Sequence, residues 1–252
     1  LLTFNPDVRK TLSHASLVLT TNEDTFNMAR DNGALHPKMF LDTSLPESFY
    51  PPTYPERKPT DELKILWVGR LFARKGLPLV LEALGKVNPE VRFKLTILGD
   101  GQMHNMVPEL IQKYKLQDKV DWKGQVPWEE VKRAYTESDL FMFCSLRDSS
   151  AAQFLEAMAY GLPILTLDLH GGKNLVPDNA GIKVSVTTPQ ETVARLADAV
   201  ERLYQNPELR EQMGQNGYAF SRSQTWPLKT KQINELYNKY TLADTEALSV
   251  IN

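Results

Sequence analysis

Residues 147–165 read RDSSAAQFLEAMAYGLPIL, and this stretch decides the fold. It opens with an acid and two serines, continues through small and apolar residues, and ends at Gly-Leu-Pro before an apolar run. Ser150 with Gln153 three residues later fits a capping box, so we expect a helix that begins at Ser150. At ~100° per residue, one face of this helix is apolar and is the predicted core side. That face consists of Ala151, Phe154, Leu155 and Met158.

Two carboxylates stand away from the predicted core side. Glu156 lies between Ala152 and Ala159, whose small side chains leave space that a ligand could fill. Asp148 precedes the cap, so the two carboxylates can touch different parts of one ligand, with an anion at the free N–H groups of residues 150–152. Alternatively, Glu156 is a solvated helix residue and Asp148 is an additional cap that stabilises by ~0.5–2 kcal/mol.

Strands and helices alternate on both sides of this stretch. The expected strands cover residues 63–69, 93–101, 120–126, 139–145, 162–168 and 181–186. The expected helices between and after them cover residues 76–87, 103–114, 128–138, 189–206, 207–222 and 225–240. This alternation predicts an α/β fold with a Rossmann-like, doubly wound, mostly parallel sheet and additional C-terminal helices. In such sheets ligands bind outside the carboxyl ends of the strands.

Proline content places a boundary near the start of this pattern. Residues 45–62 hold five prolines, which forbid a continuous helix or a central strand there. The predicted division is the end of another domain, a linker, the Rossmann-like domain, a crossover helix and a poorly ordered tail. These segments are residues 1–45, 46–62, 63–224, 225–240 and 241–252.

Composition excludes several classes of protein. The 252 residues are 42% hydrophobic and 24% charged, and the net charge is −2, so nothing indicates a nucleic-acid partner. The single cysteine, Cys144, excludes a disulfide framework and a cysteine-based metal site, and we expect no bound metal. No apolar run approaches the ~20 residues of a membrane span, and no secretory signal is visible. The chain begins at Leu1, and we expect a fragment of a longer protein.

Cations follow the first predicted strand of the Rossmann-like domain. Gly69-Arg70 ends the strand, and Lys75 stands at the start of the next helix. A helix N-terminus, a forked guanidinium and a mobile ammonium together suit a diphosphate. The same residues, with Arg74, would also serve as ordinary solvated loop cations.

Three further loops follow strands. Gly99 and Gly101 flank an aspartate, and glycines there allow either close approach of a ligand or a plain tight turn. In the Gly124-Gln125-Val126 segment, main-chain groups could pair with a nucleobase. His170 begins a His-Gly-Gly sequence that we expect to form a flexible loop, in which the histidine is structural.

Taken in series, these motifs resemble the C-terminal, donor-binding half of family-4 retaining glycosyltransferases of the GT-B fold. The resemblance covers about residues 62–240 and includes Gly-Arg…Lys-Gly, Gly-Asp-Gly, Gly-x-Val, Asp-x7-Glu-Ala-Met-Ala and Gly-Gly. It implies that Arg70 and Lys75 bind the diphosphate of a nucleotide sugar, that Glu156 holds the ribose and that Asp148 contacts the transferred sugar. It further implies a donor-binding set that also contains Gly69, Gly99, Gly101, Gln125, Val126, Ser149, Ser150, Ala151 and Ala152.

The sequence departs from that family at three places. Asp148 stands where the family usually has the longer glutamate, and Ser150-Ala151 replaces the usual Phe-Gly. Lys173-Asn174 replaces the familiar Pro-Glu pair after the two glycines. The bulk of the N-terminal domain is missing, so the crossover helix would lack most of its partner surface.

The resemblance implies a hexosyltransferase that uses a UDP- or GDP-linked donor, with no cofactor, and retains anomeric configuration in polysaccharide or glycoconjugate synthesis. The acceptor would be a sugar or a lipid-linked sugar bound through the missing domain, so the isolated chain would bind donor without transferring it. A cytoplasmic location, with peripheral association at the inner membrane face, fits such an acceptor. Two alternatives remain open: a nucleotide-sugar epimerase or hydrolase of the same fold, and a non-catalytic nucleotide-sugar-binding domain.

Overall fold

The computed structural model describes residues 5–57, 60–148 and 151–249. Two predicted site residues, Ser149 and Ser150, therefore lie outside the described residues. The chain divides into two compact units. The larger unit is Ser48–Ser223, and the smaller unit combines Leu1–Glu47 with Gln224–Asn252.

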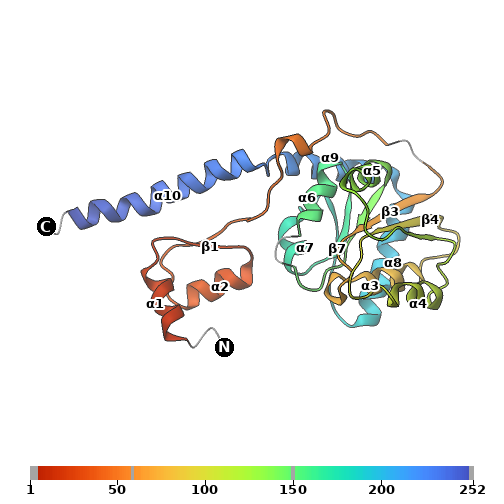
Figure 1. The fold of residues 1–252 in the computed structure, drawn as a ribbon, viewed down its shortest axis with the longest axis horizontal. Helices are drawn as coiled ribbons and strands as arrows, with labels where there is room; N and C mark the ends of the chain where they lie inside the picture. Colours follow the sequence, from red (N-terminus) through yellow and green to blue (C-terminus); the bar gives the residue numbers. More distant parts are fainter. Residues whose placement is uncertain (1–4, 58–59, 149–150, 250–252) are drawn as a thin grey trace. The chain divides into compact units, whose positions relative to one another are not determined.

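The larger unit is built on a six-stranded sheet in which every pairing is parallel (Figure 1). Its strands are β3 (Leu63–Val68), β4 (Phe93–Leu98), β5 (Val120–Trp122), β6 (Leu140–Met142), β7 (Ile164–Leu167) and β8 (Gly181–Val184). Their spatial order is β5-β4-β3-β6-β7-β8, so the winding reverses between β3 and β6. The predicted doubly wound sheet is confirmed, and its topological switch point lies between these two strands.

Helices cover both faces of the sheet. They are α3 (Leu77–Leu84), α4 (Met106–Lys113), α5 (Trp128–Glu137), α6 (Ala152–Ala159), α7 (His170–Leu175), α8 (Pro189–Gln205) and α9 (Pro207–Arg222). Short 3₁₀ turns occur at η2 (Glu47–Phe49) and η3 (Ala73–Lys75). In Figure 1, α3, α4 and α8 lie on one face, with α5, α6 and α9 on the other, and α3 packs on α8 as α6 packs on α9.

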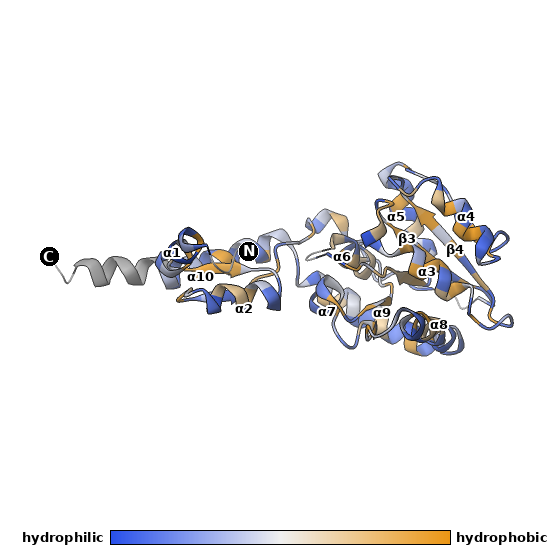
Figure 2. Cartoon of the chain, turned by 90° about the horizontal axis from the view of Figure 1, so that it is seen from below, coloured by the Kyte–Doolittle hydropathy of each residue, from blue (hydrophilic) through white to orange (hydrophobic). Residues whose placement is uncertain are grey.

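The core lies between the sheet and these helices. Leu66, Trp67, Leu95 and Phe141 from the central strands are fully buried, as expected for a parallel sheet covered on both faces. Figure 2 shows hydrophobic residues gathered in the sheet region, while α8 carries both hydrophilic and hydrophobic residues. Among the described residues, no helix has the length and apolar character needed to cross a membrane.

The structure corrects two local predictions. Helix α6 begins at Ala152, two residues after the predicted start, and its N-cap, Ala151, makes no side-chain hydrogen bond; the predicted capping residue, Ser150, lies outside the described residues. The predicted core face of α6 is confirmed, because Ala151, Phe154, Leu155 and Met158 are all buried. The expected loop at His170 is instead the start of helix α7.

The smaller unit contains two parallel strands and three helices among its described residues. Its elements are α1 (Pro6–His14), β1 (Val18–Thr20), α2 (Glu23–Asp31), β2 (Pro37–Met39) and α10 (Trp226–Ser249). Helix α10 continues past the predicted end at residue 240, so the predicted tail is helical as far as Ser249. Tyr240 lies with its ring centroid 4.7 Å from that of His36, and Lys229 lies 4.9 Å over the ring of Phe40. Part of the partner surface of α10 is therefore present in this chain.

Candidate active site

The site is built from the loops that leave β3 and β6 at the topological switch point. Because these strands are parallel neighbours, the loop after β3 and the loop after β6 emerge at the same edge of the sheet. Lys75 and Asp148, one from each loop, meet there: Nζ of Lys75 lies 2.5 Å from Oδ2 of Asp148. The structure thus brings together two of the predicted site residues that are far apart in sequence.

Asp148 has two further partners. Nη1 of Arg74 lies 3.2 Å from its Oδ1, and Oγ of Ser145 donates to its Oδ2 at 2.9 Å. Lys75 is 8% exposed, and its ammonium also lies 5.5 Å over the ring of Phe143. A buried cation without an anion beside it is costly, and the described carboxylate that compensates Lys75 is that of Asp148.

The 3₁₀ turn that carries Lys75 is fixed to the loop after β6. The carbonyl of Arg74 accepts hydrogen bonds from the amide of Leu146 at 2.8 Å and from Oγ of Ser145 at 3.1 Å. Gly76 has φ +74°, and a Cβ there would lie 1.8 Å from the carbonyl oxygen of Cys144. The close approach requires glycine, and it sets the position of the Lys75 side chain relative to Asp148.

Arg70 behaves differently from Lys75. Its side chain is exposed, directly after Gly69 at the end of β3. Among the described residues, the guanidinium of Arg70 makes no hydrogen bond or ion pair, so it is available to a ligand. Gly69 donates its amide to the carbonyl of Leu98 at 3.0 Å, which continues the β3–β4 ladder up to the residue before Arg70.

Glu156 is held by a tyrosine from the neighbouring helix. Oη of Tyr135, on α5, donates to Oε2 of Glu156 at 2.8 Å. Burial raises the pKa of Glu156, and the hydrogen bond from Tyr135 acts in the opposite direction. The sequence predicts open space on both sides of Glu156, at Ala152 and at Ala159. In the structure Ala159 is fully buried, so only Ala152, which is partly exposed, borders accessible space.

The glycines after β4 pack against protein backbone. Gly99 has φ +135°, and a Cβ there would lie 1.8 Å from the carbonyl oxygen of Gly69. A Cβ at Gly101 would likewise lie 3.0 Å from the backbone of Leu71. Both glycines therefore allow the loops after β3 and β4 to approach each other. In the neighbouring segment, Gln125 is exposed, Val126 is half-buried, and the carbonyl of Gly124 accepts from the amide of Gly99 at 2.7 Å.

Helix α7 adds a contact that the sequence did not indicate. The amide of Gly171 donates to the carbonyl of Asp148 at 2.6 Å, which ties the start of α7 to the residue that carries the carboxylate. The altered Lys173-Asn174 pair is in this short helix, and both residues are exposed. The departure from the family pattern after the two glycines therefore falls on the outer side of α7.

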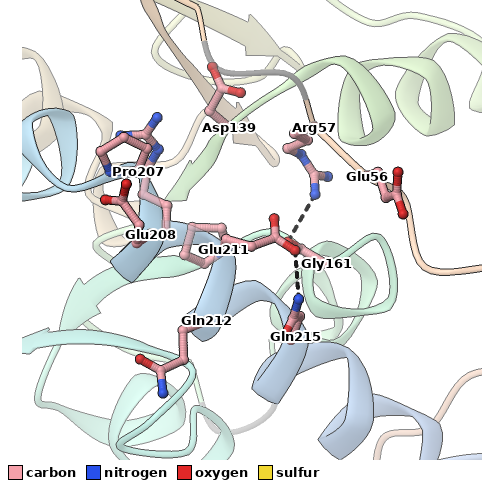
Figure 3. Close-up of a pocket in the computed structure, with 11 residues that line it drawn as sticks. Glu56, Arg57, Asp139, Gly161, Pro207, Glu208, Glu211, Gln212 and Gln215 are labelled. Atoms are coloured by element: carbon pink, nitrogen blue, oxygen red, sulfur yellow. Dashed lines mark hydrogen bonds between the residues drawn. The ribbon is translucent and has the colours of Figure 1, made fainter.

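A separate hollow lies away from Lys75 and Asp148. A cavity of about 550 Å³ lies at the amino ends of β6 and β7, at the opposite edge of the sheet from Lys75 (Figure 3). It is lined by Asp139, Glu211, Arg210 and Arg57, whose guanidinium donates to the carbonyl of Gly161. None of the predicted donor-binding residues lines it, so we assign the site by the geometry at the switch point rather than by cavity size. Among the described residues, no group of three or more His, Cys, Asp and Glu side chains comes together in a way that could hold a metal ion.

Several residues of the site were missed in the sequence. By its sequence context Arg74 reads as an ordinary loop cation, and no sequence pattern indicates Ser145 or Tyr135. Tyr135 follows Val131 by four residues on the buried side of α5, which predicts that its ring is buried but not that its hydroxyl reaches Glu156.

Comparisons with known proteins agree on one family. The glycosyl transferases group 1 family matches residues 54–220. The chain is 30% identical over 153 residues to an alpha-D-kanosaminyltransferase of Streptomyces kanamyceticus, which is 60% of this chain and 39% of that protein. It is 31% identical over 152 residues to a putative colanic acid biosynthesis glycosyltransferase, WcaL, of Escherichia coli K12, which is 57% of this chain and 37% of that protein. The match thus spans less than half the length of these curated relatives.

Solved structures share the fold. A sucrose-phosphate synthase from Thermosynechococcus elongatus superposes with a TM-score of 0.75 at 24% identity, over 93% of this chain and 61% of that chain. Alr3699/HepE from Anabaena, solved in complex with UDP, superposes with a TM-score of 0.74 at 18% identity, over 92% of this chain and 66% of that chain. At these identities the likeness shows the fold alone, which is consistent with the C-terminal half of a GT-B glycosyltransferase.

Proposed function

Because the chain belongs to the glycosyl transferases group 1 family, we propose that its larger unit binds a nucleoside-diphosphate sugar at the switch point. We propose further that the whole protein transfers the sugar to an acceptor with retention of anomeric configuration. The observation that carries the proposal is the contact of 2.5 Å between Lys75 and Asp148 where the winding of the sheet reverses.

The diphosphate is assigned to the cations after β3. Arg70 is free among the described residues, and Lys75 is buried with its charge compensated by Asp148. When a diphosphate binds, its oxygens replace the carboxylate at Lys75, so the cation is not left without an anion. Arg70 and Lys75 then stabilise the charge that develops on the departing diphosphate, which is the electrostatic contribution such a site makes to transfer.

The ribose is assigned to Glu156 and the transferred sugar to Asp148. Oε2 of Glu156 is occupied by Tyr135, while Oε1 makes no hydrogen bond among the described residues and can accept from a ribose hydroxyl. Asp148 remains within reach of Arg74 and Ser145 after it leaves Lys75, so its carboxylate stays at the site and can accept from a sugar hydroxyl.

The donor we propose is a UDP- or GDP-linked hexose. Solved relatives of the same fold bind UDP, and one of them binds UDP-glucose. The acceptor is a sugar or a lipid-linked sugar, bound by parts of the whole protein beyond this unit. A cytoplasmic protein, with peripheral attachment to the inner membrane face, would meet both kinds of acceptor.

Calorimetric titration of the chain with UDP-glucose and with GDP-mannose tests the proposal. We expect saturable binding of one donor, with affinity reduced roughly tenfold or more in Lys75→Met and in Glu156→Gln, since each removes a charged contact. Lys64→Met is the matched control, because Lys64 is exposed at the other end of β3. Absence of binding by either donor, or equal losses in Lys75→Met and Lys64→Met, would refute the assignment.

A further inference from the structure

We propose that Tyr135 is a positioning residue of the donor site, whose hydroxyl fixes one oxygen of Glu156 and leaves the other directed to the donor. This inference rests on the proposed function, because it takes Glu156 as the ribose ligand. It assigns a second role to helix α5, which otherwise only crosses from β5 to β6.

The tyrosine ring has no freedom to move away. Tyr135 is fully buried, and its ring stacks on Tyr160 with centroids 5.7 Å apart and planes inclined by 19°. On another side it lies 5.9 Å from the ring of Phe141 in strand β6. A ring packed in this way presents its hydroxyl at one position, so the acceptor oxygen of Glu156 is fixed as well.

Arg57 holds the two helices that carry the pair. Its guanidinium donates to the carbonyls of Tyr135 and Ser138 at the end of α5, at 3.3 and 2.6 Å. It also donates to the carbonyls of Tyr160 and Gly161 at the end of α6, at 2.6 and 3.0 Å. The C-terminal ends of α5 and α6 are thereby joined by one half-buried side chain, which keeps Tyr135 beside Glu156.

The direction of the hydrogen bond is fixed by electrostatics. Burial together with the charge of Glu156 raises the pKa of Tyr135 well above its ordinary value, so the phenol stays protonated and must donate. Burial raises the pKa of Glu156, and the bond from Tyr135 is the opposing effect that favours the carboxylate. Tyr135 is therefore a described side chain whose hydrogen bond favours the carboxylate form of Glu156.

A buried hydroxyl is stabilised by any hydrogen-bond acceptor, whether or not the bond matters for ligand binding. The experiment must therefore distinguish a Tyr135 that positions Glu156 from a Tyr135 that only uses Glu156 as its acceptor. Titration of the full 252-residue chain with UDP, or with GDP where the wild-type chain binds only GDP, does so through Tyr135→Phe, which removes one oxygen atom. We expect a roughly tenfold loss of UDP affinity, the amount that a hydrogen bond to a charged group supplies. Tyr160→Phe is the matched control, because it removes the same atom from the ring stacked on Tyr135.

The pH profile is the readout that a structural role would not move. Without the hydroxyl, the pKa of Glu156 rises further, so the pH at which UDP affinity is half-maximal shifts upward in Tyr135→Phe and stays at the wild-type value in Tyr160→Phe. Thermal unfolding of both variants confirms that they are folded before titration.

A double substitution shows whether Tyr135 acts through Glu156. In a Glu156→Ala background, Tyr135→Phe is expected to cause no further loss of UDP affinity, because the group it positions is gone. An additional loss there, or an unshifted pH profile in Tyr135→Phe, would overturn the inference while leaving donor binding intact. Failure of the wild-type chain to bind both UDP and GDP, or full nucleotide binding by Glu156→Ala, would instead overturn the proposed function.

Discussion

Lys75 and Asp148 are 73 residues apart in sequence, yet Nζ of the lysine lies 2.5 Å from Oδ2 of the aspartate. The contact joins the loop after β3 to the loop after β6, the two strands between which the winding of the sheet reverses. It gives a buried ammonium a negative partner in the absence of donor. Under the proposed function, the stability of the chain and its affinity for a diphosphate therefore depend on the same two side chains.

Asp148→Asn is expected to lower the free energy of unfolding by about 2 kcal/mol, because it leaves the ammonium of Lys75 in a poorly solvated place without a carboxylate. Arg74→Gln removes the other cation from the same carboxylate but is expected to cost under about 1 kcal/mol, since the Arg74 side chain is 47% exposed. Urea unfolding measures both. Equal effects would contradict the view that Lys75 is the main partner of Asp148.

Gly76→Ala is expected to destabilise the chain by about 3 kcal/mol or more. Gly76 has φ +74°, and the new Cβ would lie 1.8 Å from the carbonyl oxygen of Cys144, so the loop after β3 must shift away from the loop after β6. Gly124→Ala is the matched control, because Gly124 has φ +69° but no atom within 4 Å of the added Cβ. It is expected to cost only the ~1 kcal/mol of a left-handed backbone. Thermal unfolding compares the two, and similar losses would mean that the close approach is unimportant.

Arg57→Lys is expected to lower the free energy of unfolding by about 2–4 kcal/mol. The ammonium cannot reproduce the planar fork that donates to carbonyls at the ends of both α5 and α6, so buried carbonyls lose their donors. Arg92→Lys, at an exposed position, is expected to change little. Urea unfolding gives both values, and a neutral Arg57→Lys would show that the helices are held by other contacts.

Glu156→Gln is expected to be at least as stable as the wild type at neutral pH, although it binds donor more weakly. Burial raises the pKa of Glu156 in the folded chain, so between the unfolded and folded pKa values the folded state binds more protons. Wild-type stability therefore falls as pH rises through that interval, and the glutamine variant lacks this loss. Urea unfolding measured from acidic to neutral pH should show that the free energy of unfolding of Glu156→Gln rises relative to that of the wild type. A constant difference across this range would contradict the assignment.

Much of the fold follows from local patterns. The apolar runs at residues 63–69 and 93–101 and the helical spacing between them predicted a parallel doubly wound sheet, because a strand buried on both faces has a distinctive composition. The exact starts of helices were harder. The Ser150-Gln153 pattern predicted a capped start, whereas α6 begins at Ala152 without a side-chain cap. The sequence does not indicate helix α7, because its two glycines disfavour a helix, and the packing that stabilises the helix cannot be seen in the sequence.

The sequence by itself determined the kind of residue at each position of the site: cations after β3, an acid after β6 and a glutamate on the following helix. Their spacing also carried the resemblance to glycosyltransferases. Only the tertiary structure decided that Asp148 pairs with Lys75 and Arg74, and that Tyr135 holds Glu156. Those contacts join residues from separate βα units, and their distances depend on how the loops and helices pack. Spacing along the chain cannot encode such distances, because they are set by close approaches such as that of Gly76 to Cys144.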